Sequence, residues 1–276
     1  MKAIYTYAAL ALCSVSFAQQ LFIVNSDNKF GVVNENGVEI IPAKYTSVDE
    51  FDMIHPNWSK VGLDNLYGFI DKTGKIIIEP KYQEINAYNT LHEGWALIKK
   101  DGKYGFIDNA GKEIVPPVYD KVGAFGDYVK DWMLVEANGL KGFVDKDGNV
   151  IVPIKYTQVE KFDNIRKNWS LVKDSKDKLG FIDKTGKVRI TFEYSEINPF
   201  QSGLAIVAQG KGRYGIINKF NAKIAPCVFK SITMTPDGQY EIVDNSSDKY
   251  ILNKGGDCVS ANAKDFYEIV RKANKK

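Results

Sequence analysis

One unit recurs along this chain about every 37 residues, and this period limits the fold more than any other feature. Each copy contains a step from an aromatic or polar residue to glycine, and successive glycines lie 37, 37, 37, 38 and 35 residues apart. These glycines are Gly31, Gly68, Gly105, Gly142, Gly180 and Gly215. Repeats of this length form folds in which each copy packs mainly against its neighbours in the sequence.

Other residues keep the same phase. An aromatic follows each glycine by fourteen positions, at Tyr45, Tyr82, Tyr119, Tyr156, Tyr194 and Phe229. The four tryptophans, Trp58, Trp95, Trp132 and Trp169, are each 37 residues apart. Leu21 and Leu204 take the tryptophan position in the first and sixth copies. A worn seventh copy follows at Tyr240 and Tyr250, where Ile251 occupies the expected glycine position.

The third copy shows the strands that one unit predicts. Trp95–Lys99, Tyr104–Asp108 and Glu113–Pro116 read as strands, with a hairpin turn at Asp101-Gly102 between the first two. Pro116-Pro117 is expected to end the third strand, because proline donates no ladder hydrogen bond. A short extended piece or turn follows around Tyr119. Alternation along the second strand predicts that Phe106 and Ile107 face opposite sides.

Glycine inside a strand needs an explanation, because it normally lowers stability there. We expect either a bulge or the close approach of a large aromatic, Trp95 or Tyr119, against Gly105. The second glycine of each copy, such as Gly111, closes a turn and is expected to have a positive φ.

These residues resemble the WG β-repeat, a family of bacterial repeats. The pattern is carried by Tyr104-Gly105-Phe106-Ile107-Asp108-Asn109-Ala110-Gly111, followed by Ile114-Val115-Pro116 and Tyr119. The resemblance covers Leu21 to Asp257, although the residue before each glycine is Phe, Tyr, Lys or Leu instead of Trp. It implies tandem repeats in an exported bacterial protein, with no catalytic residue common to the family.

The ends of the chain differ from the repeats. Residues 1–18 read as a secretory signal peptide cut after Ala18, because the apolar run is too short to span a bilayer. A membrane anchor and a lipoprotein signal around Cys13 are the alternatives. Residues 261–276 predict an amphipathic helix with Asn262 as its N-cap, which would cover the exposed edge of the last copy.

The sequence therefore predicts an all-β fold in three parts. Residues 1–18 are the signal peptide, residues 19–260 are the repeat domain, and residues 261–276 are the capping helix. The copies span about 21–57, 58–94, 95–131, 132–168, 169–203 and 204–240, with a degenerate copy at 241–260. We expect three-stranded antiparallel units in an open, solenoid-like array, and a closed β-propeller is the alternative.

Composition and motifs argue against most kinds of chemistry. A net charge of +3 on 276 residues does not indicate nucleic-acid binding, and no cofactor is implied. Two histidines and three cysteines are little material for a metal site or a catalytic dyad. The aspartates three residues after the glycines are expected to cap turns rather than bind calcium; they are Asp71, Asp108, Asp145 and Asp183. Cys227 and Cys258 would remain after signal cleavage, either paired in a disulfide or as separate thiols.

The role of the four tryptophans, in packing or in ligand binding, is the main functional question that the sequence raises. Aromatics at a fixed repeat position either pack between copies or line a sugar-binding face, and the Leu at positions 21 and 204 favours packing. We therefore expect a non-enzymatic protein, exported to the periplasm or the exterior, that binds another protein or an envelope component. The alternative is a glycan-binding module that uses Trp58, Trp95, Trp132 and Trp169. The sequence leaves the oligomeric state open.

Overall fold

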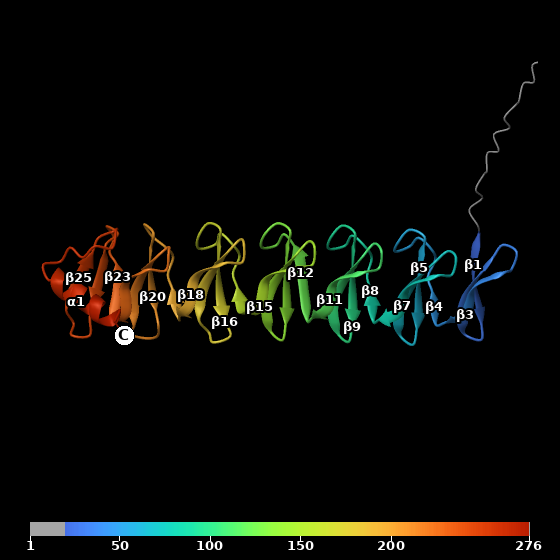
Figure 1. Ribbon diagram of the computed structural model, residues 1–276, viewed down its shortest axis with the longest axis horizontal. Coiled ribbons are helices and arrows are strands. Elements are labelled where there is room, and N and C mark those ends of the chain that lie inside the picture. Colours follow the sequence, from blue (N-terminus) through green and yellow to red (C-terminus); the bar gives the residue numbers. More distant parts are fainter. Residues whose placement is uncertain (1–19, 276) are drawn as a thin grey trace, which may run out of the picture. The chain divides into compact units, whose positions relative to one another are not determined.

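The computed structural model describes residues 20–275, so the predicted signal peptide lies outside the described residues. The chain divides into two compact units, Met1–Ala87 and Tyr88–Lys276. Both are built from short antiparallel strands, and the described chain has one helix, close to its C-terminal end (Figure 1). The all-β prediction is confirmed.

The first unit contains two sheets and one further short strand. The sheets have the strand orders β1-β2-β3 and β4-β5-β6-β7. The strands are β1 (Leu21–Ser26), β2 (Lys29–Asn34), β3 (Glu39–Tyr45), β4 (Ser47–Val48), β5 (Trp58–Leu63), β6 (Leu66–Asp71), β7 (Ile76–Tyr82) and β8 (Glu84–Ile85).

The second unit continues the pattern. Strands β9 to β11 are paired in chain order, β12 to β18 form a seven-stranded sheet, and β19 to β22 and β23 to β25 form two more sheets. The strands are β9 (Trp95–Lys100), β10 (Lys103–Asp108), β11 (Glu113–Tyr119), β12 (Lys121–Phe125), β13 (Trp132–Ala137), β14 (Leu140–Asp145), β15 (Val150–Val159), β16 (Trp169–Asp174), β17 (Leu179–Asp183), β18 (Val188–Tyr194), β19 (Glu196–Ile197), β20 (Leu204–Ala208), β21 (Tyr214–Asn218), β22 (Lys223–Phe229), β23 (Ser231–Met234), β24 (Tyr240–Val243) and β25 (Lys249–Leu252). Helix α1 spans Ala263–Ala273.

Sheets that are consecutive in the sequence are also neighbours within each unit. Figure 1 shows the sheets of residues 88–276 in chain order, and the main contacts of that unit join strands of the same or the next copy. The open arrangement of tandem repeats is therefore confirmed within each unit.

The third copy shows how the strands arise. Strands β9 and β10 lie where they were predicted, joined by a turn in which Asp101 and Gly102 have φ values of 50° and 75°. Two residues of positive φ are typical of the tight turn that matches the twist of a hairpin. The second glycine, Gly111, has a φ of 78°, as expected for its turn.

Strand β11 does not end at its prolines, as the sequence predicted, but continues to Tyr119. The register of the ladder gives the reason. Tyr104 pairs with Tyr119 and Phe106 pairs with Val115, so three residues of β11 stand opposite the single residue Gly105. This bulge contains both prolines, which therefore interrupt no regular ladder pairing.

The bulge also explains the repeat glycine. A Cβ atom on Gly105 would lie 2.5 Å from the carbonyl oxygen of Val115 and 2.6 Å from the nitrogen of Pro117. The expected approach of the Trp95 or Tyr119 ring is wrong, and the bulge given as the alternative is confirmed. The same backbone contact with the third strand recurs at Gly31, Gly68, Gly142, Gly180 and Gly215.

The short piece after the repeat tyrosine is a strand that joins the sheet of the next copy. Strand β4 pairs with β5, β12 with β13, and β19 with β20. In the fourth copy this piece is continuous with the third strand, so β15 pairs with both β14 and β16. Most sheets therefore contain four or more strands instead of the three predicted.

The cores lie at the junctions between copies. Phe181 packs with Val207 and Ile217 of the sixth copy, whereas its neighbour Ile182 packs with Phe143 of the fourth. The predicted alternation is thus correct, but each face of the strand belongs to a different core, and Phe181 and Ile182 are both fully buried. A single copy buries its middle strand only when a neighbour lies on either side.

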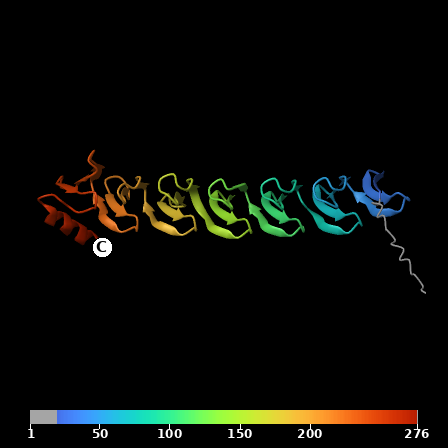
Figure 2. The same cartoon turned by 90° about the horizontal axis from the view of Figure 1, so that it is seen from above.

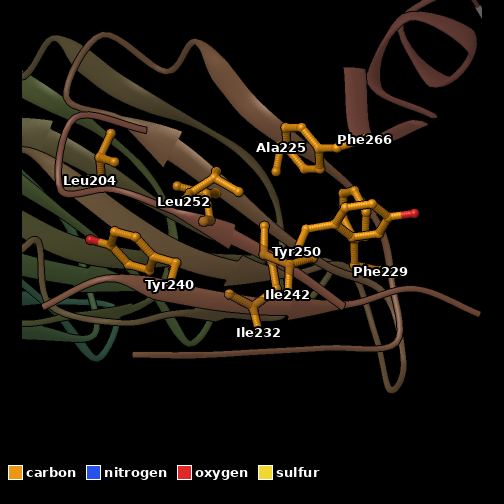
Figure 3. Packing of buried hydrophobic residues seen from close by; sticks show 10 residues of the cluster. Leu204, Ala225, Phe229, Ile232, Tyr240, Ile242, Tyr250, Leu252 and Phe266 are labelled. Atoms are coloured by element: carbon orange, nitrogen blue, oxygen red, sulfur yellow. The ribbon is translucent and has the colours of Figure 1, made fainter. Parts of the chain in front are cut away.

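Helix α1 closes the last core. Asn262 precedes the helix as predicted, although its side chain makes no capping hydrogen bond. The helix packs on this core through Phe266, which stacks on Phe229 with ring centroids 5.7 Å apart and lies 5.7 Å from the ring of Tyr250 (Figure 3). The segment that leads into the helix bonds to β25, where the Ile251 backbone amide donates to Ser260 Oγ and the Asn262 side-chain amide donates to the Lys249 carbonyl oxygen. Figure 2 shows α1 beside the last sheets of this unit.

The worn seventh copy lacks a third strand. In the ladder, Tyr250 pairs with Ile242 as Gly105 pairs with Ile98, so Tyr250 and not Ile251 takes the glycine position. Within residues 20–275, the segment after β25 makes one isolated bridge, between Leu252 and Cys258. Because no bulged strand approaches, a ring fits where the other copies need glycine.

Candidate functional site

Each tryptophan lies against phenylalanine rings. Trp95 has its ring centroid 5.3 Å from that of Phe106, on the next strand, and 5.4 Å from that of Phe125, at the end of the short strand β12. Trp132 and Trp169 have equivalent pairs of phenylalanine neighbours, and Trp58 lies 5.5 Å from Phe69.

This packing leaves little indole surface for a ligand. Trp95 and Trp132 are 7% and 8% exposed, and Trp58 and Trp169 are half-buried. A sugar ring could stack on Trp95 or Trp132 only by displacing a phenylalanine. The geometry supports a packing role for Trp95 and Trp132, whereas Trp58 and Trp169 keep part of their surface exposed.

A recurrent loop positions these rings. In the loop before Trp169, Asp163 and Asn168 have φ values of 68° and 67°. The Asp163 carboxylate accepts a hydrogen bond from the backbone amide of Asn168 and forms an ion pair with Lys184. The Lys184 ammonium and the Asn168 amide hold the pKa of Asp163 below its usual value. The same loop, with Asp52, Asn57 and Lys72, precedes Trp58.

The two histidines belong to this loop. His55 stacks on Trp58 with ring centroids 3.8 Å apart, and His92 lies 4.8 Å from Trp95. Arg166 takes the same place before Trp169, and its guanidinium carbon lies 4.6 Å above the ring of Trp169. Residues 20–275 contain no group of three His, Cys, Asp or Glu side chains that could hold a metal ion.

The repeated aspartates cap turns, as predicted. The Asp108 carboxylate accepts hydrogen bonds from the amides of Ala110 and Lys112, each 2.9 Å long. Asp183 accepts equivalent bonds from Thr185 and Lys187, and a further bond from Arg189. Partial burial acts to raise the pKa of Asp183, but these hydrogen bonds outweigh it and lower the pKa below its usual value.

Cys227 and Cys258, the two cysteines among residues 20–275, are separate thiols in the structure. Cys227 is buried in the core shared by the fifth and sixth copies, and burial raises the pKa of its thiol to about 11. Cys258 is partly exposed and packs against the last core. Of the two arrangements that the sequence allowed, the structure has the unpaired one.

Hollows occur in the two copies that lack tryptophan. In the first copy Leu21 replaces the tryptophan and Val32 replaces its phenylalanine neighbour, and a hollow of about 510 Å³ opens beside them and Phe51. In the sixth copy Leu204 and Ile216 make the same replacement, and a second hollow of about 300 Å³ is lined by Leu204 and neighbouring side chains. Each hollow is lined by the leucine that stands in the tryptophan position.

The most exposed large apolar side chain described is Phe220, at 77%. It lies at a turn, beside a shallow pocket of about 380 Å³, and the ammonium group of Lys219 is 5.0 Å from its ring centroid. We call the residues that line this pocket the Phe220 patch: Trp169, Val188, Arg189, Lys219 and Phe220.

The sequence does distinguish Phe220 from the equivalent residue of the other copies, but a comparison of the residues that the copies share does not detect it. The position of Phe220, one residue before the second glycine or its replacement Asn221, is small or polar in the five preceding copies: Asn36, Thr73, Ala110, Asp147 and Thr185. Phe220 is thus a departure from the repeat that no turn requires. Arg189 and Lys219 add positive charge beside it.

Structural comparison finds weak likenesses to solved structures. They include the computationally designed protein Ika8 (11% identity, 85% of this chain and 81% of that chain, TM-score 0.26). They also include BamB from Moraxella catarrhalis (11%, 85% and 81%, 0.25) and AztD from Citrobacter koseri (10%, 87% and 78%, 0.26). TM-scores of this size carry no argument about fold or function. No curated protein matches the sequence.

In the described residues, no helix combines the length and apolar character needed to cross a membrane.

A family match agrees with the repeat phase. The family described as WG containing repeat matches residues 30–52, 67–104, 104–139, 142–174 and 180–212, together more than half of the chain. Each matched segment begins at the aromatic-glycine step or at its glycine. With its glycine, its bulged third strand and its capped turn repeated in register, this chain belongs to the WG containing repeat family.

Proposed function

We propose that this chain is an exported, non-enzymatic scaffold that binds another protein, and that the Phe220 patch is a contact site. The observation that carries the proposal is the exposure of Phe220, at 77%, beside the half-buried Trp169. Aromatic side chains and arginine are enriched where protein interfaces gain most of their binding energy.

The chemistry of the patch indicates the kind of partner. Phe220, Trp169 and Val188 offer an apolar surface, and Lys219 and Arg189 lie at its side. Arg189 is already paired with Asp183, whereas the Lys219 ammonium lies over the Phe220 ring. The patch suits an apolar side chain of a partner that is followed or preceded by acidic residues.

The use of polar groups in the repeats supports a non-enzymatic role. The turn aspartates each bind backbone amides, and the loop aspartates Asp52 and Asp163 each bind an amide and a lysine. Such groups serve the fold, whereas a catalytic site needs a unique arrangement. The predicted signal peptide supports export, and mass spectrometry of the protein isolated from its cells should find Gln19 at the N-terminus.

Affinity capture from an envelope extract tests the binding role. The tagged chain starting at Gln19 should retain a partner protein, and Phe220→Asp should lose it. Val150→Asp is the matched control, because Val150 is 53% exposed on the same unit and lies outside the patch. Equal capture by wild type and Phe220→Asp would overturn the assignment of the patch, and capture of glycan alone would overturn the protein-binding role.

A further inference from the structure

The outer edge of strand β1 has no partner within residues 20–275. In later copies the equivalent strand carries a short strand on this edge: β4 pairs with β5, β12 with β13, and β19 with β20. The first sheet has the order β1-β2-β3, so β1 ends it. A free edge presents backbone donors and acceptors that can pair with another strand.

The side chains of β1 are uncovered as well. Phe22 and Ile23 are 46% and 40% exposed. The register places Phe22 where the second copy has Ser59, because Phe22 pairs with Val33 as Ser59 pairs with Ile70. Ser59 is fully buried, and the equivalent Met133 and Ala205 are at most 1% exposed. The face of β1 that later copies bury at a junction is therefore open.

Nothing in β1 protects this edge from pairing. Its sequence, Leu-Phe-Ile-Val-Asn-Ser, contains no charged residue and no proline. Strand β3, at the opposite edge of the same sheet, contains Pro42 and Lys44. Proteins that stay monomeric usually protect an exposed edge with lysine, proline or a bulge. Strand β3 follows this rule and β1 does not.

The structure also shows which backbone groups of β1 point outward. On β5 the carbonyl groups of Lys60 and Gly62 accept hydrogen bonds from the short-strand segment, at 2.9 and 2.8 Å. Register makes Ile23 and Asn25 the equivalents of Lys60 and Gly62. The backbone of Ile23 therefore faces the free edge, where it can exchange hydrogen bonds with another strand.

We propose that a second copy of this chain occupies the edge, with β1 pairing antiparallel to its own counterpart around a two-fold axis at Ile23. This register pairs Ile23 with Ile23, Phe22 with Val24, and Leu21 with Asn25. No like charges meet, and aromatic residues opposite β-branched residues are favourable cross-strand pairs. The result is a six-stranded sheet across two chains, and one self-complementary patch is the usual basis of a two-fold dimer.

The test uses charge at the two-fold axis. The chain starting at Gln19 should show a concentration-dependent dimer by sedimentation equilibrium between about 1 and 100 µM. Ile23→Lys and Ile23→Glu each place like charges opposite each other, so each variant alone should dimerise at least about tenfold more weakly. An equimolar mixture of the two should recover the dimer, because opposite charges then face each other.

Val38→Lys is the control, because Val38 is 56% exposed in the same copy and lies outside β1. Circular dichroism and melting of each variant separate loss of dimer from loss of fold. A wild type that stays monomeric over the range would overturn the proposal and leave the edge to a strand of a different protein. A dimer insensitive to Ile23→Lys, or a mixture that stays monomeric, would also overturn it.

Discussion

At the scale of single residues, backbone approach explains why the same glycine recurs. The third strand bulges toward Gly105, and the carbonyl oxygen of Val115 occupies the place where a Cβ would stand. Gly123 has no such neighbour, since its nearest contact for a Cβ, the Leu134 carbonyl oxygen, lies at 3.5 Å. Glycine is therefore sterically required at position 105, whereas position 123 has room for a Cβ atom.

We expect Gly105→Ala to destabilise the protein by about 1 to 3 kcal/mol, because the new methyl group must displace backbone atoms of β11. Gly123→Ala should change the free energy of unfolding by less than about 0.5 kcal/mol, since the contact it makes is ordinary. Urea denaturation of both variants gives the comparison. Equal effects would mean that the bulge does not set the requirement for glycine.

Because the repeat tyrosines are buried, we expect the stability of the fold to decrease at alkaline pH. Burial raises the pKa of Tyr156 from about 10 to about 12, and Tyr156 is 1% exposed. The unfolded chain thus loses the Tyr156 hydroxyl proton at lower pH than the folded chain. The contribution of this protonated hydroxyl to the free energy of unfolding is therefore complete below pH 10 and is lost as the pH rises toward 12. The shift corresponds to about 3 kcal/mol.

The sixth copy has Phe229 at this position, which suggests the control variant. Tyr156→Phe should lose less stability between pH 10 and 12 than the wild type does. Denaturant titrations at several pH values, with absorbance at 295 nm to follow tyrosine ionisation, measure the difference. If the free energy of unfolding depends on pH identically in the two proteins, then ionisation of Tyr156 does not contribute to the loss of stability.

At the scale of elements, the tryptophan-phenylalanine pair is a unit that two copies have lost. Where Trp95 and Phe106 pack in the third copy, Leu21 and Val32 leave a hollow in the first. The double variant Leu21→Trp and Val32→Phe should fill the hollow and raise stability by about 0.5 to 2 kcal/mol. The reverse double variant, Trp95→Leu and Phe106→Val, should lower stability by about 2 to 4 kcal/mol.

Thermal and urea denaturation of both double variants test this symmetry. If the Leu21→Trp and Val32→Phe double variant is less stable than the wild type, then the hollow does not accommodate a tryptophan-phenylalanine pair of rings. Such a result would favour a binding role for the hollow over a simple loss of rings.

Sequence period predicted the strands and turns well because both depend on local signals. Asp101-Gly102 and Gly111 fix their turns through φ, so neighbouring residues suffice to place them. The continuation of β11 past Pro116 and Pro117 was missed, because it depends on the register of β11 against β10. Tyr250 was misplaced for the same reason, since only the ladder shows that it takes the glycine position.

The candidate site was harder to predict than the fold. Phe220 departs from the repeat pattern in one copy only. A search for residues common to all copies therefore does not find it. The open edge of β1 also depends on an absence: within residues 20–275 no short strand pairs with β1 as β4 pairs with β5. Both features depend on how the copies differ and not on their common motif.

At the scale of the molecule, stability is distributed over the junctions. In Tyr88–Lys276 each core combines residues of two consecutive copies, as when Val144 packs with Phe106 on one side and Phe143 packs with Ile182 on the other. Copies held only through neighbours are expected to unfold as coupled local units. Damage to one copy should therefore spread to the next before it reaches the end of the unit.

Gly142→Ala tests this locality in the fourth copy. Its Cβ would lie 2.5 Å from the Val152 carbonyl oxygen, so β15 must shift away from β14 and loosen both junctions that this copy shares. Hydrogen exchange followed by mass spectrometry should show raised exchange centred on residues 121–183, while β23 to β25 and α1 keep their protection. Gly123→Ala serves again as the control, since it should leave exchange in β13 and β14 unchanged. A uniform rise from β9 to β25 would show instead that the unit unfolds as one cooperative body, and the additive description of its stability would then be abandoned.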